Sequence, residues 1–150
     1  MTLADGSVIR YAYNWQNKLV ARTKGPEVRT YLYGKGTQVM EEQINGKRYA
    51  LYGWGPDGLL SRTDANGGSL FYLKDAQGRV MALVDARGAM IHEDRYTAYG
   101  EDLDGADAVN PFRFEGGLGG RKDDATGLVV FWNRWYDPAV GRWVSEDPIR

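Results

Sequence analysis

Two Asp-Pro pairs near the end of the printed sequence have the residue types that acid–base chemistry needs. They are Asp137-Pro138 and Asp147-Pro148. Two carboxyl groups that share a proton can serve as base and acid in hydrolysis, provided that they lie close together. Asp123 and Asp124 are candidates for the second carboxyl group. The alternative is that each Asp-Pro pair forms a turn that ends a strand, and this interpretation is favoured.

Other kinds of chemical site find little support in the residue types. His92 is the single histidine and cysteine is absent, which argues against a zinc site, a His-based triad and thiolate chemistry. The run Gly116–Gly120 lacks the Lys-Ser/Thr of a phosphate-binding loop and indicates a flexible bend. The acidic stretch 101–107 does not fit the EF-hand template and indicates a solvated loop. We therefore expect no cofactor and no metal ion.

The composition narrows the class of partner. A chain of 150 residues with 43% hydrophobic residues can form one packed domain. The formal net charge of −1 gives no overall attraction to nucleic acid or to an anionic membrane. No apolar run is long enough to insert into a bilayer, and the first residues do not resemble a signal peptide.

The elements that would position these residues repeat along the chain. Four glycines, Gly25, Gly46, Gly67 and Gly88, follow one another at intervals of 21 residues, and each lies in a turn-forming pair. Two further series alternate with them: Tyr13, Tyr33, Tyr52 and Tyr72, and Leu19, Val39, Leu59 and Val80. Each unit of about 20 residues is therefore expected to be one β-hairpin, an aromatic strand followed by an aliphatic strand. The dominant regular structure should be strand, with helix limited to a turn or two.

The repeat and the end of the sequence together resemble a known family. The Tyr-Gly-Leu/Val unit resembles the YD repeat of the RHS (rearrangement hotspot) proteins. The segment "NPFRFEGGLGGRKDDATGLVVFWNRWYDPAVGRWVSEDPIR" (110–150) resembles the RHS-associated core. Pro-Phe-Arg-Phe, Thr-Gly-Leu, Arg-x-Tyr-Asp-Pro, Gly-Arg-Trp and Asp-Pro-Ile occur there in the family's order. In "RYTAYGE" (95–101), Thr97 replaces the aspartate that the family commonly has.

This resemblance implies an architecture and a role. The fold is expected to be all-β: hairpin repeats of a YD ribbon over residues 1–100, and a core module over residues 101–150 that curls inward. Such proteins wind the ribbon into a hollow shell around a variable C-terminal polypeptide, often a toxin. The implied partners are that effector cargo and the remainder of the shell, and the full-length protein is expected to be secreted or on the cell surface. The core-motif residues are Arg134, Tyr136, Pro138, Gly141, Arg142, Trp143 and Pro148.

Two alternatives to this structural role remain open. In many relatives, Asp-Pro-x-Gly-Leu precedes a self-cleavage by acidic side chains, which assigns catalytic roles to Asp147 and Asp137. Arg150 stands where that motif has glycine, so a turn is favoured over present cleavage, and enzyme activity beyond self-cleavage is not expected. The second alternative is an adhesion module in which exposed aromatic rings bind glycans. Finally, a ribbon with unpaired edge strands is expected to self-associate.

Overall fold

Nine strands follow one another as a continuous antiparallel meander, which we call the ribbon. The computed structural model describes residues 1–34, 36–103, 110–114 and 116–144. The ribbon strands pair in chain order. Their bounds are β1 Ile9–Tyr13, β2 Leu19–Lys24, β3 Glu27–Tyr33, β4 Val39–Ile44, β5 Lys47–Gly55, β6 Gly58–Asp64, β7 Ser69–Lys74, β8 Val80–Asp85 and β9 Met90–Glu93.

The glycine series forms one row of turns at the ends of these strands. Gly25, Gly46, Gly67 and Gly88 have φ values of 57°, 79°, 88° and 81°, a left-handed conformation that glycine adopts without steric cost. Each of them lies between an even-numbered strand and the next strand of the meander. The 21-residue interval is therefore the length of one hairpin, as the sequence predicted.

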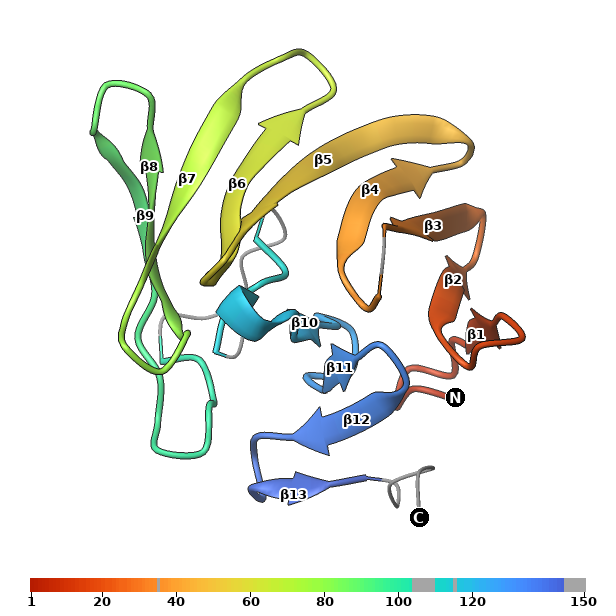
Figure 1. Ribbon diagram of the computed structural model, residues 1–150. Helices are drawn as coiled ribbons and strands as arrows, with labels where there is room; N and C mark the ends of the chain where they lie inside the picture. The colour runs from red at the N-terminus through yellow and green to blue at the C-terminus, as the bar shows by residue number, and fades with distance from the viewer. Residues whose placement is uncertain (35, 104–109, 115, 145–150) are drawn as a thin grey trace.

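An extra residue recurs at one position of each hairpin and curves the ribbon. Ala12 lies opposite Ala21, but Tyr13 lies opposite Leu19, so Val20 has no cross-strand partner. The same shift leaves Met40, Leu60 and Met81 unpaired in the next three hairpins. A bulge bends its strand and increases the local twist. The ribbon accordingly curls into an arc from β1 to β9 (Figure 1).

The aliphatic series forms the centre of the core. Leu19, Val39, Leu59 and Val80 are at most 4% exposed and lie on the inner face of the arc. The structurally equivalent aromatics are Tyr11, Tyr31, Tyr52 and Tyr72, because these face Arg22, Glu42, Arg62 and Leu83 across the hairpins. The predicted aromatic series therefore contained Tyr13 and Tyr33 in place of Tyr11 and Tyr31, two residues too far along the chain. This error explains why one interval of the predicted series was 19 residues.

A second sheet lies in the hollow of the arc (Figure 1). Its strands are β10 Arg121–Lys122, β11 Val129–Phe131, β12 Arg134–Asp137 and β13 Arg142–Trp143, and a 3₁₀ helix, η1 Gly116–Leu118, precedes them. We call β10–β13 the inner sheet. Apart from η1, the regular structure of the described residues is strand, so the all-β prediction is confirmed. Nowhere in these described ranges is a helix long and apolar enough to cross a membrane.

Candidate functional site: the interface between ribbon and inner sheet

Phe112 is the centre of the contact between the two parts of the chain. Its side chain is fully buried. The ring meets the edges of three ribbon aromatics, with centroid distances of 4.8 Å to Tyr52, 5.9 Å to Trp54 and 6.5 Å to Tyr72. Edge-to-face pairs of this kind contribute about 0.5–1.5 kcal/mol each beyond the burial of apolar area. One residue of the segment before the inner sheet thus connects β5 with β7.

The ribbon bulges bind the described residues 110–114 and 116–144, which we call the inner segment, through backbone hydrogen bonds. Leu19 N–H donates to the Trp132 carbonyl at 2.8 Å, and Val80 N–H donates to the Arg113 carbonyl at 3.0 Å. Leu19 and Val80 occupy equivalent positions beside bulges of the first and fourth hairpins. Trp132 has φ 37°, which is uncommon for a bulky residue. The same device that curves the ribbon therefore presents donors to the inner segment.

Neighbouring hairpins are also joined at the bulges, through side chains. The Tyr33 hydroxyl donates to the Leu19 carbonyl at 2.7 Å, and the Trp54 indole N–H donates to the Val39 carbonyl at 2.8 Å. Tyr33 and Trp54 hold equivalent positions in successive hairpins, and so do their acceptors. Each aromatic side chain thus reaches back to the preceding hairpin.

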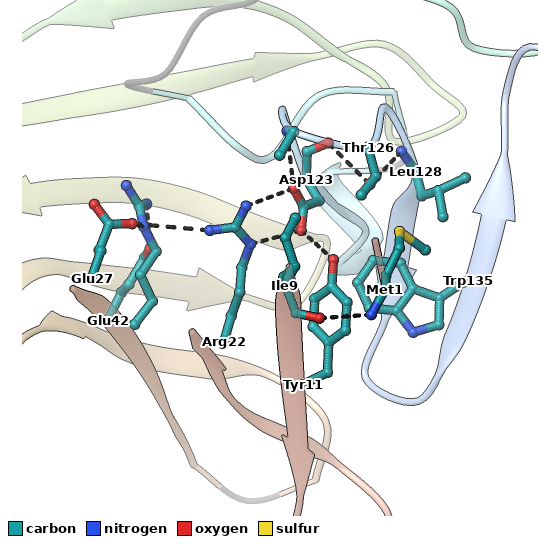
Figure 2. Close-up of polar contacts among 12 residues, drawn as sticks. Met1, Ile9, Tyr11, Arg22, Glu27, Glu42, Asp123, Thr126, Leu128 and Trp135 are labelled. Atoms are coloured by element: carbon teal, nitrogen blue, oxygen red, sulfur yellow. Dashed lines mark hydrogen bonds and ion pairs between the residues drawn. The ribbon is translucent and has the colours of Figure 1, made fainter. Parts of the chain in front are cut away.

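Asp123 connects the inner segment to the first hairpin (Figure 2). Its carboxylate accepts hydrogen bonds from Arg22 Nε at 2.7 Å, Arg22 Nη2 at 3.0 Å and the Tyr11 hydroxyl at 2.8 Å. Burial by itself raises the pKa of this carboxyl group. The hydrogen bonds and the charge of Arg22, together with Tyr11, outweigh burial and hold the pKa of Asp123 below its usual value.

Asp124, the other candidate for the second carboxyl group, lies beside a different arginine from the one that binds Asp123. Asp124 Oδ1 lies 3.7 Å from Arg113 Nη2, and burial raises the pKa of the Asp124 carboxyl group. Arg113 is itself almost fully buried and contacts Asp102 at 2.6 Å. Asp94 is a further buried carboxyl group, bonded to His92 Nε2 at 2.9 Å, and burial raises its pKa as well. Arg113 thus forms ion pairs with Asp102 and Asp124, and Asp94 is hydrogen-bonded to His92; the sequence alone did not indicate these contacts.

Of the two aspartates in the Asp-Pro pairs, Asp137 is among the residues that the structure describes. Asp137 ends β12, where its carboxylate accepts from Ala139 N–H at 3.0 Å and its carbonyl accepts from Gly141 N–H at 2.9 Å. These are bonds of a turn between β12 and β13. Asp147 and Pro148 lie outside the described residues. The turn interpretation of Asp137 agrees with its contacts.

The remaining core-motif residues surround that turn. The Arg134 guanidinium lies 3.9 Å from the Trp143 ring centroid, and the Tyr136 hydroxyl donates to the Tyr99 carbonyl at 2.8 Å. Gly141 has φ 67°, and a Cβ atom there would lie 2.8 Å from the Tyr99 ring. Pro138 is buried, whereas Arg142 is exposed. The motif thus forms a packed corner of the inner sheet against the 94–103 segment.

The glycine-rich run before β10 is a docking element, and its interpretation as a flexible bend was wrong. Gly117 N–H donates to the Gly78 carbonyl at 3.0 Å. A Cβ on Gly117 would lie 2.6 Å from that carbonyl oxygen, and a Cβ on Gly58 would lie 2.0 Å from the Gly117 oxygen. The absence of side chains therefore lets η1 approach two ribbon turns backbone to backbone.

A curled hairpin ribbon whose inner face is covered by its own C-terminal segment defines a class of protein: a β-shell wall with an inward-folded end. The sequence matches the family described as Teneurin YD-shell over residues 2–149, and the chain belongs to that family.

Relatives and a solved structure agree with this assignment. The chain is 30% identical to the tRNA3(Ser)-specific nuclease WapA of Bacillus spizizenii over 96% of its own length and 6% of that protein's. It is 33% identical to the double-stranded DNA deaminase toxin A of Burkholderia cenocepacia over 50% of its own length and 6% of that protein's. The crystal structure of TcdB2-TccC3-TEV shares the fold, with a TM-score of 0.70 at 20% identity over 97% of this chain and 8% of that one. The chain therefore spans a small part of the proteins that it matches.

Proposed function

We propose that this chain is a wall segment of a larger shell and that its inward-folded end helps to enclose a C-terminal effector polypeptide. The observation that supports this role is the nest of ribbon aromatics around Phe112 on the inner face. A container needs its inner wall held in one curvature, and a side chain that joins β5 to β7 from the inside resists flattening of the ribbon.

The relatives support a structural role for the shared segment. One is named a tRNA nuclease and the other a DNA deaminase toxin, two different chemistries. A segment common to both is better suited to a shared structural task than to either reaction. We propose that catalysis belongs to other parts of such proteins, that the effector and the rest of the shell are the partners, and that the complete protein acts outside the cell or on its surface. We also propose a division into ribbon (1–100) and core module (101–150).

Enclosure can be tested by protease protection in the complete natural gene product. We expect the C-terminal effector to resist trypsin while the shell is native and to be digested once mild denaturant opens it. Phe112→Asp places a charge among Tyr52, Trp54 and Tyr72, so it should speed digestion about tenfold or more. Phe71→Asp, at a partly exposed ribbon position, should leave the rate unchanged. An effector that is digested equally fast in the native protein would contradict the proposal.

Self-cleavage is the alternative function and has a separate test. Asp137 is engaged in its own turn, which supports an inert chain. We expect the mass of the gene product to stay constant over time, and Asp147→Asn to change neither the fold nor the chain length. A cut shortly after Asp147 that disappears in the Asn variant would establish the protease function instead.

A further inference from the structure

A cavity of about 100 Å³ lies between the first two hairpins and the inner segment. Its volume is several times what one water molecule needs. Its wall includes ribbon residues from β1 to β4 and the described residues 111 and 121–124 of the inner segment. The charged side chains of the wall are Arg22, Arg29, Arg121, Lys122, Glu42, Asp123 and Asp124. Four cations face three carboxylates, so the wall carries one excess positive charge.

The three carboxylates are already engaged. Asp123 is held by Arg22 and Tyr11, as described above. Glu42 accepts from Arg29 Nη1 at 3.0 Å and from the Tyr52 hydroxyl at 2.9 Å. Asp124 lies beside Arg113. Lys122 contacts Asp102 outside the wall. Arg22, Arg29 and Lys122 therefore each have a carboxylate within ion-pair distance, whereas Glu42 acts on Arg121 only from a longer distance.

Arg121 is the one cation of the cavity wall that has no ion pair within the described residues. It is 95% buried and stacks on Tyr31, with its guanidinium carbon 3.6 Å from the ring centroid. Within the part of the chain that the structure describes, Arg121 Nη2 has no hydrogen-bond partner, and no carboxylate lies within ion-pair distance of this side chain. A buried, unsatisfied guanidinium N–H costs about 1–3 kcal/mol or more. A ligand that accepts this hydrogen bond would recover that free energy.

We propose that this cavity binds a carboxylate group, with Arg121 as its charge partner. A carboxylate is small enough for the volume, matches the planar guanidinium geometry and supplies the one negative charge that the wall lacks. The group can come from a small free carboxylate or from an Asp or Glu side chain of a polypeptide. Only the polypeptide source depends on the proposed enclosure.

Acetate titrated into the whole chain tests the site, with acetamide as the neutral isostere. We expect acetate to shift the Nε–H resonance of Arg121 and the amide resonances near Tyr31 in a saturable way, with about millimolar affinity, as suits four non-hydrogen atoms. Acetamide should leave these resonances unchanged. If acetate produces no saturable shift, or if acetamide produces the same shift, the proposal is overturned, whatever the variants do.

Arg121→Met should weaken acetate binding about tenfold or more while keeping the volume filled. Arg62→Met is the matched control: Arg62 is equally buried and also has an unpartnered atom within the described chain, but it does not line the cavity. Undiminished binding in the Arg121 variant would contradict the assignment.

A blocked Gly-Glu-Gly peptide compared with Gly-Gln-Gly then identifies the source of the carboxylate. Binding of the Glu peptide supports a polypeptide side chain, and binding of acetate alone supports a free carboxylate.

Discussion

Asp123 is bonded to Arg22, a residue of the first hairpin that lies 101 positions earlier in the sequence. Its carboxylate sits between Arg22 and Tyr11 of the first hairpin, and its carbonyl and amide hold the turn before β11 (Figure 2). Both charged partners are mostly buried, with side-chain exposures of 12% for Arg22 and 4% for Asp123. A buried pair gives little net stability over an apolar pair, but loss of one partner leaves an uncompensated charge.

We therefore predict that Asp123→Asn lowers the free energy of unfolding by about 3 kcal/mol, because Arg22 stays buried and keeps only a 4.0 Å contact to the Glu27 carboxylate. Urea unfolding followed by tryptophan fluorescence measures the change. Asp137→Asn is the control, because that carboxylate only accepts a hydrogen bond within its own turn, and we expect a loss of about 1 kcal/mol or less. Equal losses in the two variants would show that the Arg22 contact contributes nothing specific.

The lowered pKa of Asp123 also predicts how stability depends on pH. A group whose pKa is lower in the folded state contributes stability above its unfolded pKa of about 4, and this is lost as the pH falls through the folded pKa. Asp94 and Asp124 have the opposite sign, since burial raises the pKa of each carboxyl group, and their contribution decreases as the pH rises above about 4.

Asp123→Asn should therefore lose less stability than the wild type on acidification from about pH 5 to pH 2. Urea midpoints measured across this range test the prediction. Parallel curves for the two proteins would mean that Asp123 does not carry the acid sensitivity of the interface.

At the scale of elements, η1 is the piece whose position depends on glycine. Gly117→Ala would place a Cβ atom 2.6 Å from the Gly78 oxygen, so η1 or the ribbon turn has to move. We predict a loss of about 1–3 kcal/mol, comparable to other overpacked sites. Gly68→Ala is the control, because its Cβ would meet the nearest atom at an ordinary 3.5 Å. Thermal unfolding compares the two, and a Gly117 variant as stable as the Gly68 variant would contradict tight docking.

The elements of the ribbon could be predicted from sequence because local chemistry fixes them. Gly25, Gly46, Gly67 and Gly88 each need a positive φ, and a turn residue marks its own position whatever the tertiary context. The aliphatic series was also visible, since every member is buried at the same point of its hairpin.

The bulges and the inner contacts could not be predicted in the same way. Val20, Met40, Leu60 and Met81 are ordinary strand residues, and only the pairing register shows that each lies opposite no residue. The expected aromatic series went wrong for a different reason: Tyr11 and Tyr13, like Tyr31 and Tyr33, are two residues apart, and the sequence does not show which of each pair matches Tyr52. The contact of Asp123 with Arg22 depends on the curvature of the whole ribbon, and no local sequence pattern determines that curvature.

For the whole molecule, the curled ribbon ends in the strands β1 and β9, which form the two edges of the nine-stranded sheet. Met90 and Ile91 on β9 are 59% and 55% exposed. An exposed apolar edge strand offers backbone groups and side chains to another strand. The expectation of self-association made from the sequence stays a prediction, and the structure now names the edge at which to test it.

We predict that the isolated chain associates as its concentration rises and that Ile91→Lys shifts this association to at least about tenfold higher concentration, because a lysine on an edge strand opposes strand pairing. Phe71→Lys is the matched control: Phe71 is 42% exposed but lies on β7, inside the sheet, where it is paired with Ser61 of β6 and Val84 of β8. Sedimentation velocity over a concentration series measures both variants. If Phe71→Lys suppresses association as strongly as Ile91→Lys, the contact runs through the exposed apolar residues of the sheet face, and edge pairing is the wrong explanation.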